Sequence, residues 1–573
     1  MQKSITAAKF AAKYLMSHPN SDLPKLKSKL ASKYKTSILK NTEILAAAPS
    51  FAARKKLLPI LQLRPMRTGS GVSPVAIMPK PFVCVGKCTY CPQGENAPKS
   101  YTGFEPATMR AIENHYDPRA QIESRLSQYG ALGHPTDKCE LILMGGTFLA
   151  VPKHFRHEFL LETFNAFNSP KLHAAKSPPK QIDPRTQKIY APPIARKIAN
   201  SLSKYEKMPL EKLDKLIASS QKTNESSSHR VIGMTFETRP DWCTRKDIDE
   251  VLFLGGTRVE LGVQTLQDEI LDRVKRGHRM DAVYRATADL RNASFKIGYH
   301  MMPGLYGTRQ TNTQNLINIF TDSRLMPDML KIYPCLVVPG TGLYEEWKAG
   351  KFTPLTTDEA IQLIADATPS FPEWVRVMRM QRDIPAPKIA AGVKNGNLHQ
   401  MVMRELDKRG KKCRCIRCRE VFSPYRKDEN NKNKTRTTKQ KPLQLEMVKR
   451  KYVAADGAEH FLSYEDIEAD LLAGFIRLRF PPNSHRREIS KNSALIRELH
   501  VYGSEYSIGA DKISAGQGAQ HQGIGKALLK EAETMSRDAG KEKMLIISGI
   551  GSRNYYRKFG YERDGPYMGK KLS

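Results

Sequence analysis

Residues 81–92 read Pro81-Phe-Val-Cys-Val-Gly-Lys-Cys-Thr-Tyr-Cys-Pro92 and place Cys84, Cys88 and Cys91 on one short loop. Thiolates at this CxxxCxxC spacing can bind three irons of a [4Fe-4S] cluster and leave the fourth iron open, whereas ordinary electron-transfer clusters take four cysteines. An open iron can chelate S-adenosylmethionine (SAM), and radical chemistry of this kind belongs to cofactors. A zinc knuckle or three buried thiols are the alternatives, but no fourth zinc ligand follows within the next twenty residues. The loop therefore predicts a cluster and a SAM site.

Short strands alternate with helices from about residue 76 to 400. Strand candidates are 140–145, 231–236, 258–262, 296–301 and 330–333. This rhythm indicates parallel β/α units, closed or partly closed into a barrel, with the chemistry at the C-terminal ends of the strands. A basic insert at about 169–230, which contains Pro-rich and Ser-rich runs, interrupts the pattern, and we expect it to form a mobile loop or lid.

Glycine and polar residues near the strand ends are the candidates for cofactor binding in this barrel. Two glycines allow the backbone to approach a ligand closely, although a Gly-Gly-Thr turn is also a common entry to a helix. A carboxylate at the end of a strand suits ribose hydroxyls, and residues four apart on a strand share one face. The alternative for each charged residue is a satisfied surface ion pair. The candidates are Gly145, Gly146, Thr147, Glu237, Glu260, Gln264 and Lys296, with His300 and Lys331 as weaker ones.

A second cysteine triplet, Cys413, Cys415 and Cys418, has the tighter spacing CxCxxC. The spacing favours a structural zinc site with three cysteines and one further ligand. His399 is the nearest upstream candidate for that ligand, and a second iron–sulfur cluster is the less favoured metal. Basic residues around the triplet would also stabilise thiolates.

The C-terminal segment, 445–573, predicts a smaller α/β domain. Strand candidates are 472–479, 494–501 and 544–548, and a helix is expected over 523–538. The helix follows a QxxGxG turn, which presents bare backbone amides to a pyrophosphate with help from the helix dipole. The turn consists of Gln520, His521, Gln522, Gly523, Ile524 and Gly525. It resembles the acyl-CoA site of the GNAT acetyltransferase superfamily, which implies acetyl-CoA binding and a phenol near the thioester sulfur, here Tyr555 or Tyr556.

The composition favours a polyanionic partner. The 573 residues carry a formal charge of +35, and a surplus this large would otherwise be self-repelling. No apolar run is long enough to span a membrane. Clustered cysteines indicate metal sites in a reducing compartment, and the N-terminus lacks a signal-peptide core, so we expect a cytoplasmic protein, with a transit peptide left open.

Four segments follow from these patterns. Residues 1–75 form a basic helical arm, with a helix capped by Ser21-Asp22, which either packs as a solvated helix or binds phosphates. Residues 76–398 form the barrel, and 399–444 form a metal-binding linker. The linker includes a charged insert at about 423–441 that we expect to be disordered. Residues 445–573 form the acetyltransferase-type domain.

Several runs together resemble the catalytic subunit of Elongator and its stand-alone prokaryotic counterparts, in which a radical-SAM partial barrel of the TIM type precedes a GNAT domain. They are Ser100-Tyr-Thr-Gly-Phe-Glu-Pro-Ala-Thr-Met-Arg110, Leu143-Met-Gly-Gly-Thr-Phe148, Gly233-Met-Thr-Phe-Glu-Thr-Arg-Pro-Asp241, Arg497-Glu-Leu-His-Val-Tyr-Gly503 and Asp564-Gly-Pro-Tyr-Met568. The three-residue gap between Cys84 and Cys88 is similar to the prokaryotic form, so the other Elongator subunits are not assumed.

The resemblance implies an enzyme that modifies tRNA. A radical made from SAM abstracts hydrogen from the methyl group of acetyl-CoA, and the product adds to C5 of the wobble uridine (position 34), which leaves a carboxymethyl group after hydrolysis. The implied partners are a tRNA anticodon stem-loop, acetyl-CoA and an electron donor. Two alternatives stay open: a protein lysine acetyltransferase with an inert barrel, for which Glu498 is a conceivable base, and a non-catalytic tRNA-binding scaffold.

Overall fold

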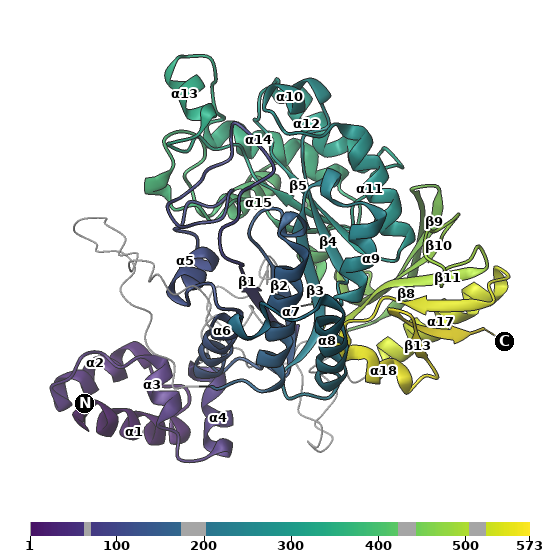
Figure 1. Cartoon of the computed structure of the whole chain (residues 1–573). Helices are drawn as coiled ribbons and strands as arrows, with labels where there is room; N and C mark the ends of the chain where they lie inside the picture. The colour runs from purple at the N-terminus through teal and green to yellow at the C-terminus, as the bar shows by residue number, and fades with distance from the viewer. Residues whose placement is uncertain (1, 62–69, 173–201, 422–442, 503–522, 573) are drawn as a thin grey trace.

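The computed structural model describes residues 2–61, 70–172, 202–421, 443–502 and 523–572 (Figure 1). A helical N-terminal unit lies on one side of a central α/β barrel, and a smaller α/β domain lies on the other side. The predicted fold class is confirmed. Among the described residues, none of the helices combines the length and the apolar character needed to span a lipid bilayer.

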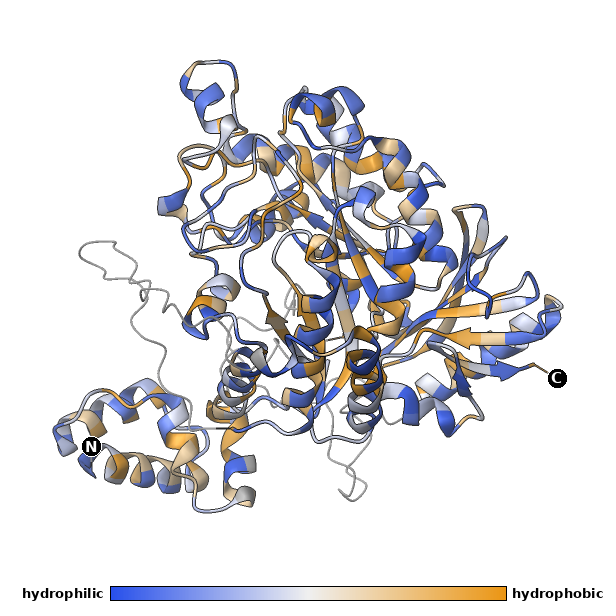
Figure 2. Ribbon diagram, in the orientation of Figure 1, coloured by the Kyte–Doolittle hydropathy of each residue, from blue (hydrophilic) through white to orange (hydrophobic). Residues whose placement is uncertain are grey.

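The central sheet has seven parallel strands in the order β1-β2-β3-β4-β5-β6-β7. They are β1 Ser73–Ile77, β2 Lys138–Leu143, β3 Arg230–Thr238, β4 Arg258–Gln264, β5 Lys296–Met301, β6 Met329–Ile332 and β7 Arg376–Arg379. Because β1 and β7 each pair on one side only among the described strands, the barrel is partial. Figure 2 shows apolar residues concentrated on these strands, as burial on both faces requires.

Helices connect and cover the strands. They are α5 Pro106–Glu113, α6 Pro118–Leu132, α7 Lys153–Asn168, α8 Leu210–Asn224, α9 Arg245–Phe253, α10 Asp268–Arg273, α11 Met280–Asn292, α12 Arg309–Asn318, α13 Gly342–Lys348, α14 Thr357–Ala367, α15 Leu398–Lys408 and α16 Ile416–Arg419. Side-chain caps fix several starts: the Asp117 carboxylate accepts the Ala120 N–H, and Thr244 and Asp247 form a capping box at α9.

Helix α8 corrects the expectation of a mobile insert for residues 202–230. Leu213 and Ile217, one turn apart, are fully buried, and α8 packs against α7. His157 Nδ1 lies 2.5 Å from Asp214 Oδ1, and Ser227 Oγ donates to Asn168 Oδ1 at 2.8 Å. The sequence of this segment is rich in lysine, so the two apolar residues that form the buried face of the helix did not stand out. Residues 173–201 of that insert and the insert at 423–441 lie outside the described residues.

The N-terminal unit contains α1 Gln2–Ser17, α2 Leu23–Tyr34, α3 Asn41–Ala46 and α4 Phe51–Leu61 around a small core. The predicted cap is confirmed, because the Asp22 carboxylate accepts the Lys25 N–H at 3.0 Å. Leu30 is buried while Lys29 and Lys33 are exposed, so the helix has one apolar and one basic face. The unit docks on α6, where Arg54 Nη2 donates to the Gly130 carbonyl at 2.6 Å.

The C-terminal domain has a seven-stranded sheet in the order β13-β14-β12-β11-β10-β9-β8. The strands are β8 Glu446–Ala454, β9 Gly457–Asp466, β10 Leu471–Phe480, β11 Ser493–Val501, β12 Lys543–Ile546, β13 Glu562–Asp564 and β14 Tyr567–Lys571. All pairs are antiparallel except β11 and β12, and helix α17 Ile524–Asp538 packs on β9, β10 and β11. The predicted strands and helix are confirmed to within two residues.

A buried ionic network joins the two α/β domains. Asp328, in the loop before β6, accepts two hydrogen bonds from Arg497 of β11 at 2.6 and 2.7 Å. Glu459 of β9 accepts from Arg479 at 2.9 Å and from Arg291 of α11 at 3.1 Å. None of these five side chains is more than 1% exposed. Such a network fixes how the domains sit against each other.

Candidate active site

One cavity of about 380 Å³ opens where the barrel strands end, and Cys84, Cys88 and Cys91 all line it. The cysteine loop is held against two neighbouring segments, since the Thr89 N–H donates to the Val274 carbonyl and the Thr89 carbonyl accepts the Leu343 N–H. Chemistry at the C-terminal edge of a parallel barrel is the general arrangement. The cysteine loop therefore lies at the C-terminal ends of the strands, where the sequence predicted the chemistry.

Arg276 and Arg239 surround the loop with positive charge. Arg276 Nη1 donates to Cys88 Sγ at 3.5 Å, and Nη2 donates to the Gly262 carbonyl at 2.6 Å. A Cβ at Gly86 would lie 2.5 Å from Arg239 Nη1, so a side chain there would displace the guanidinium from the loop. Burial, with the neighbouring Cys88, raises the pKa of the Cys91 thiol to about 11. Metal binding removes the thiol protons, and the nearby positive charges offset the cost of burying the resulting thiolates.

These residues fit a cluster with a bound polar ligand. Three thiols face one cavity, and several buried polar atoms of its lining residues, among them Arg239 Nη1 and Gln264 Oε1, have no hydrogen-bond partner. Buried polar groups are normally satisfied, so unpaired ones at a cavity wall indicate where a ligand binds.

A lysine that also lines the cavity pairs with both strand carboxylates. Lys331 of β6 contacts Glu260 of β4, and its Nζ lies 3.3 Å from Glu237 Oε1 of β3. His300 Nε2 lies 2.8 Å from Glu260 Oε2, and Tyr101 OH donates to Glu237 Oε2 at 3.2 Å. Burial alone would raise the pKa of Glu260, but Lys331 and His300 hold it well below its usual range. Glu237, Glu260 and His300 have ligand atoms close enough to hold a metal ion, but the Lys331 ammonium already supplies the positive charge there.

The Gly145-Gly146-Thr147 turn borders a groove beside Cys84. Both glycines have positive φ, +120° and +87°, which other residues rarely adopt. A Cβ at Gly146 would lie 3.0 Å from the Lys99 carbonyl oxygen. The turn thus needs both glycines to bring its backbone next to the cysteine loop.

The structure brings Glu237, Glu260 and Gln264 to the cavity with the cysteines, and what they bind stays a prediction. Lys296 is not among the residues that line the cavity. It begins β5 at the opposite end of the barrel, with its Nζ 3.6 Å from Glu498 Oε1. Strand periodicity gives the face of a side chain but not its position along the barrel axis, so the sequence could not show that Lys296 lies away from the cavity. Tyr101 and Arg239 lie inside motifs quoted above, whereas Arg276 had no signal in the sequence.

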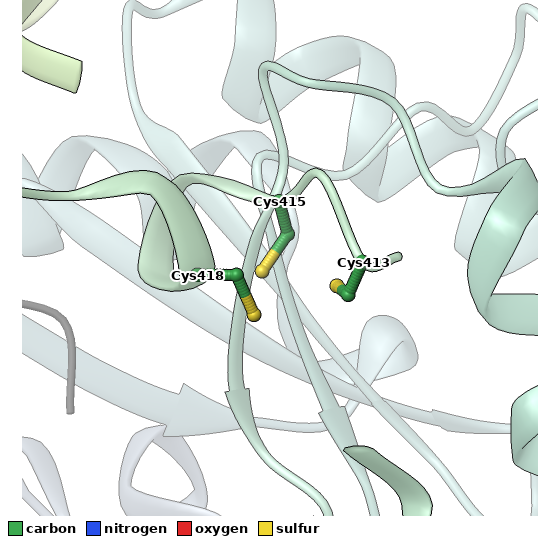
Figure 3. Close-up of side chains that lie close together, drawn as sticks. All are labelled: Cys413, Cys415 and Cys418. Carbon is green, nitrogen blue, oxygen red and sulfur yellow. The ribbon is translucent and has the colours of Figure 1, made fainter. Parts of the chain in front are cut away.

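The second triplet also comes together (Figure 3). Its three sulfur atoms lie within 4.8 Å of one another, so Cys413, Cys415 and Cys418 can hold a metal ion. The Arg376 guanidinium is close enough to interact with Cys415. His399 is not part of this group of ligand atoms in the described residues, although burial lowers its pKa to about 4 and keeps it neutral. The fourth ligand stays a prediction.

The start of α17 is the candidate acyl-CoA site. Gly523 caps the helix with a left-handed φ of +78°, and a Cβ at Gly525 would lie 2.8 Å from the Tyr555 hydroxyl oxygen. Strands β11 and β12 pair only as far as Ile496 and Ile546, and β11 continues alone on that side to Val501. Tyr555 is 38% exposed, whereas Tyr556 is 7% exposed in the core, so Tyr555 is the phenol that faces the turn. Gln520, His521 and Gln522 lie outside the described residues.

Glu498 does not fit the role of a general base. Its carboxylate accepts from Arg477 Nε at 2.9 Å and pairs with Lys296. Burial would raise the pKa of Glu498, but Lys296 and Arg477 lower it to about 2. A base this weak removes a proton from an amine poorly at neutral pH.

Four family models match successive parts of the chain: the ELP3 N-terminal domain over 7–69, the radical SAM superfamily over 201–314, the radical SAM C-terminal domain over 327–408 and the GNAT acetyltransferase family over 422–561. Human Elongator complex protein 3 is 38% identical over 566 residues, which cover 96% of this chain and 93% of that protein. The chain belongs to the Elongator complex protein 3 family.

Two Methanocaldococcus relatives share more identity with this chain than the animal and yeast relatives named here. The tRNA uridine(34) acetyltransferase of Methanocaldococcus infernus is 42% identical over 93% of this chain and 91% of its own length. The solved structure of M. infernus Elp3 with an N-terminal deletion (1-46) has a TM-score of 0.69 at 38% identity, and covers 88% of this chain and all of that one. Identities to the animal and yeast relatives are 37–38%, in agreement with the prokaryotic form that the cysteine spacing indicated.

Proposed function

We propose that this chain installs a carboxymethyl group at C5 of uridine 34 in tRNA, with acetyl-CoA as the source of the carbon. The observation that carries the proposal is the single cavity lined by three cysteines and two strand carboxylates. The chain that holds this cavity is 42% identical to a protein named tRNA uridine(34) acetyltransferase.

Cys84, Cys88 and Cys91 would hold the cluster, and the Gly145-Gly146-Thr147 turn with Glu237 would hold SAM. When bound, the two groups supply a carbon radical able to take hydrogen from a methyl group. Lys331 orients both carboxylates, since it contacts Glu260 and lies 3.3 Å from Glu237. Tyr101, which is 9% exposed, donates a hydrogen bond to Glu237 and so helps to fix the position of that carboxylate.

Acetyl-CoA would bind where α17 begins. The backbone N–H groups of Ile524 and Gly525 are at a helix N-terminus, where the dipole favours a pyrophosphate. Tyr555, whose hydroxyl lies beside Gly525 at this turn, would donate a hydrogen bond to the thioester end. At the second triplet we propose zinc, because three thiolates in a compact set suit a structural zinc site.

The N-terminal unit would contact the tRNA backbone. Its described residues, 2–61, carry Asp22 and Glu43 as the only acidic side chains, against exposed lysines that include Lys9, Lys13 and Lys29. Phosphate contacts of this kind position an RNA, while the base itself must be unstacked to enter the cavity. Affinity for tRNA should therefore fall steeply as salt is raised.

The test is anaerobic turnover by the reconstituted protein with SAM, dithionite, acetyl-CoA and tRNA, followed by nucleoside mass analysis. We expect a carboxymethyl mass on uridine that disappears in Cys88→Ala and persists in Cys243→Ala, a matched change at a buried cysteine outside both triplets. Release of 5′-deoxyadenosine without a modified uridine would show that the substrate is wrong. Acetylation of protein lysines that survives Cys84→Ala would favour the acetyltransferase alternative.

A further inference from the structure

The helix that carries Tyr555 is too short to hold its own position. Helix α18 spans Arg553–Arg557, and no side chain caps its first turn. A helix of little more than one turn is unstable by itself, so tertiary contacts must set its place. One such contact lies in its own domain, where Tyr556 is buried in the apolar core. The other contact comes from the barrel domain, beside the end of α8 (Figure 1).

A single residue of the barrel domain, Glu225, makes that second contact. Glu225 directly follows α8, and its carboxylate accepts hydrogen bonds from Arg553 Nη1 at 3.2 Å and from Arg557 Nη1 at 2.7 Å. The backbone carbonyl of Glu225 accepts a third bond, from Asn554 Nδ2 at 3.1 Å. These donors lie on both sides of Tyr555 in the sequence, so Glu225 holds the whole helix.

The Glu225 carboxylate is buried and ionised. The residue is 4% exposed. Burial would raise the pKa of Glu225, but Arg557, Lys222 and Arg553 hold it below its usual range. Hydrogen bonds between charged groups are about twice as strong as those between neutral groups. A buried carboxylate with these partners can therefore fix the position of a short helix.

The segment before α18 rests on the barrel as well. Ile550 is 1% exposed, and a side chain at Gly551 would overlap Arg230 at the start of β3. The Tyr555 hydroxyl, in contrast, lies beside Gly525 at the turn of its own domain. The barrel thus supports the helix from which Tyr555 reaches the candidate acyl-CoA site.

We propose that Glu225 of the barrel domain is a positioning residue for the acyl-CoA site, which holds α18 so that the Tyr555 hydroxyl meets the thioester end of the ligand. The inference rests on the proposed function, because it needs acetyl-CoA at the start of α17. The effect of Glu225 on the ligand goes through Tyr555. The acyl-CoA site is therefore complete only when the barrel domain is docked.

The test measures the binding of acetyl-CoA and of CoA to the full chain by isothermal titration calorimetry, together with the thermal unfolding of each variant. Binding of either ligand does not need the cluster, so the result is independent of the radical chemistry. Glu225→Gln keeps the shape of the side chain and removes its charge. Arg557→Gln changes a partner whose side chain is 31% exposed. Glu531→Gln is the matched control, since Glu531 pairs with Lys449 inside the C-terminal domain.

We expect Glu225→Gln to weaken acetyl-CoA binding about 3- to 10-fold, the value of one hydrogen bond, and Arg557→Gln to act in the same direction. Binding of CoA, which lacks the acyl group, should stay unchanged, as should acetyl-CoA binding by the control. Adding Tyr555→Phe to Glu225→Gln should weaken acetyl-CoA binding no further, because both changes remove the same contact.

Three results would overturn the proposal: an unchanged affinity for acetyl-CoA, equal losses for acetyl-CoA and CoA, or effects of Glu225→Gln and Tyr555→Phe that add. A lower midpoint of thermal unfolding with any of these would show that Glu225 only forms an ion pair between the domains. If Glu225→Gln does not fold, Arg557→Gln decides by the same criteria. A wild-type chain that does not bind acetyl-CoA would instead show that the proposed function fails.

Discussion

Replacing Asp328 by Asn tests whether the buried network holds the two α/β domains together. The Asp328 carboxylate accepts two hydrogen bonds from Arg497, and the side chains of Arg291 and Arg477 lie 3.7 and 3.5 Å from it. An amide keeps the shape but has no charge and only one acceptor atom. The change leaves three guanidinium groups buried with less compensation, and breaking a buried pair costs about 3–5 kcal/mol.

The magnitude converts into a measurable shift. At about 2 °C for each kcal/mol in a large domain, Asp328→Asn should lower the midpoint of thermal unfolding by at least about 6 °C. The matched control is Asp272→Asn, which breaks an exposed pair with Arg279. Exposed pairs contribute about 0–1 kcal/mol, so the control should shift the midpoint by no more than about 2 °C. Equal shifts in the two variants would refute the reasoning.

The pH dependence gives a second check on the same residue. Burial would raise the pKa of Asp328, but Arg497, Arg291 and Arg477 hold it well below its usual range. A group whose pKa is depressed on folding contributes stability above its unfolded pKa, about 3.9 for Asp. The difference between wild type and Asp328→Asn should therefore be full at pH 6 and shrink below about pH 4. A difference that grows on acidification would contradict the assignment.

Three further substitutions test the sites. Arg276→Met removes a hydrogen bond and a positive charge beside Cys88, so the reduction potential of the cluster should fall. A redox titration monitored by electron paramagnetic resonance measures that potential. Arg273→Met, a change at an exposed arginine, should not alter it. Tyr555→Phe should weaken acetyl-CoA binding about 3- to 10-fold, the value of one hydrogen bond, and Tyr556→Phe should not; equal effects would disprove the assignment. Cys415→Ser should abolish the metal content that belongs to the second triplet, whereas Cys139→Ser should retain it, as measured by elemental analysis.

The strands of the barrel were predictable because parallel strands buried on both faces are continuous apolar runs. Strand β5 was predicted with its observed ends, Lys296–Met301. Strands β1 and β7 were missed, since Ser73–Ile77 contains a proline and Arg376–Arg379 begins and ends with arginine. The sequence of such a segment does not show that it pairs with a neighbouring strand of the sheet.

Site residues that lie in short motifs could be predicted from the sequence. Site residues that reach the cavity only through tertiary packing could not. The cysteine loop and Glu237 came from spacing and strand position, whereas Arg276 reaches Cys88 across 188 positions of the chain. The interdomain arginines are a clearer case. Arg291, Arg479 and Arg497 are fully buried, although arginine in a sequence normally indicates exposure.

The same arginines constrain how the two sites cooperate. A hinge that separated the domains would expose apolar surface and break the pairs of Arg497 with Asp328 and of Arg291 with Glu459. The two domains are also in close contact at Gly549. This glycine lies so near the Ile232 carbonyl of β3 that a side chain at position 549 would overlap that carbonyl. Relative domain motion is expected unless the interface is large and apolar, and here one buried apolar cluster includes residues of both domains, among them Val377 of β7 and Phe475 of β10. We therefore infer that the barrel cavity and the start of α17 keep a fixed separation, and under the proposed function the acyl group and the RNA would move between them while the two domains stay in place.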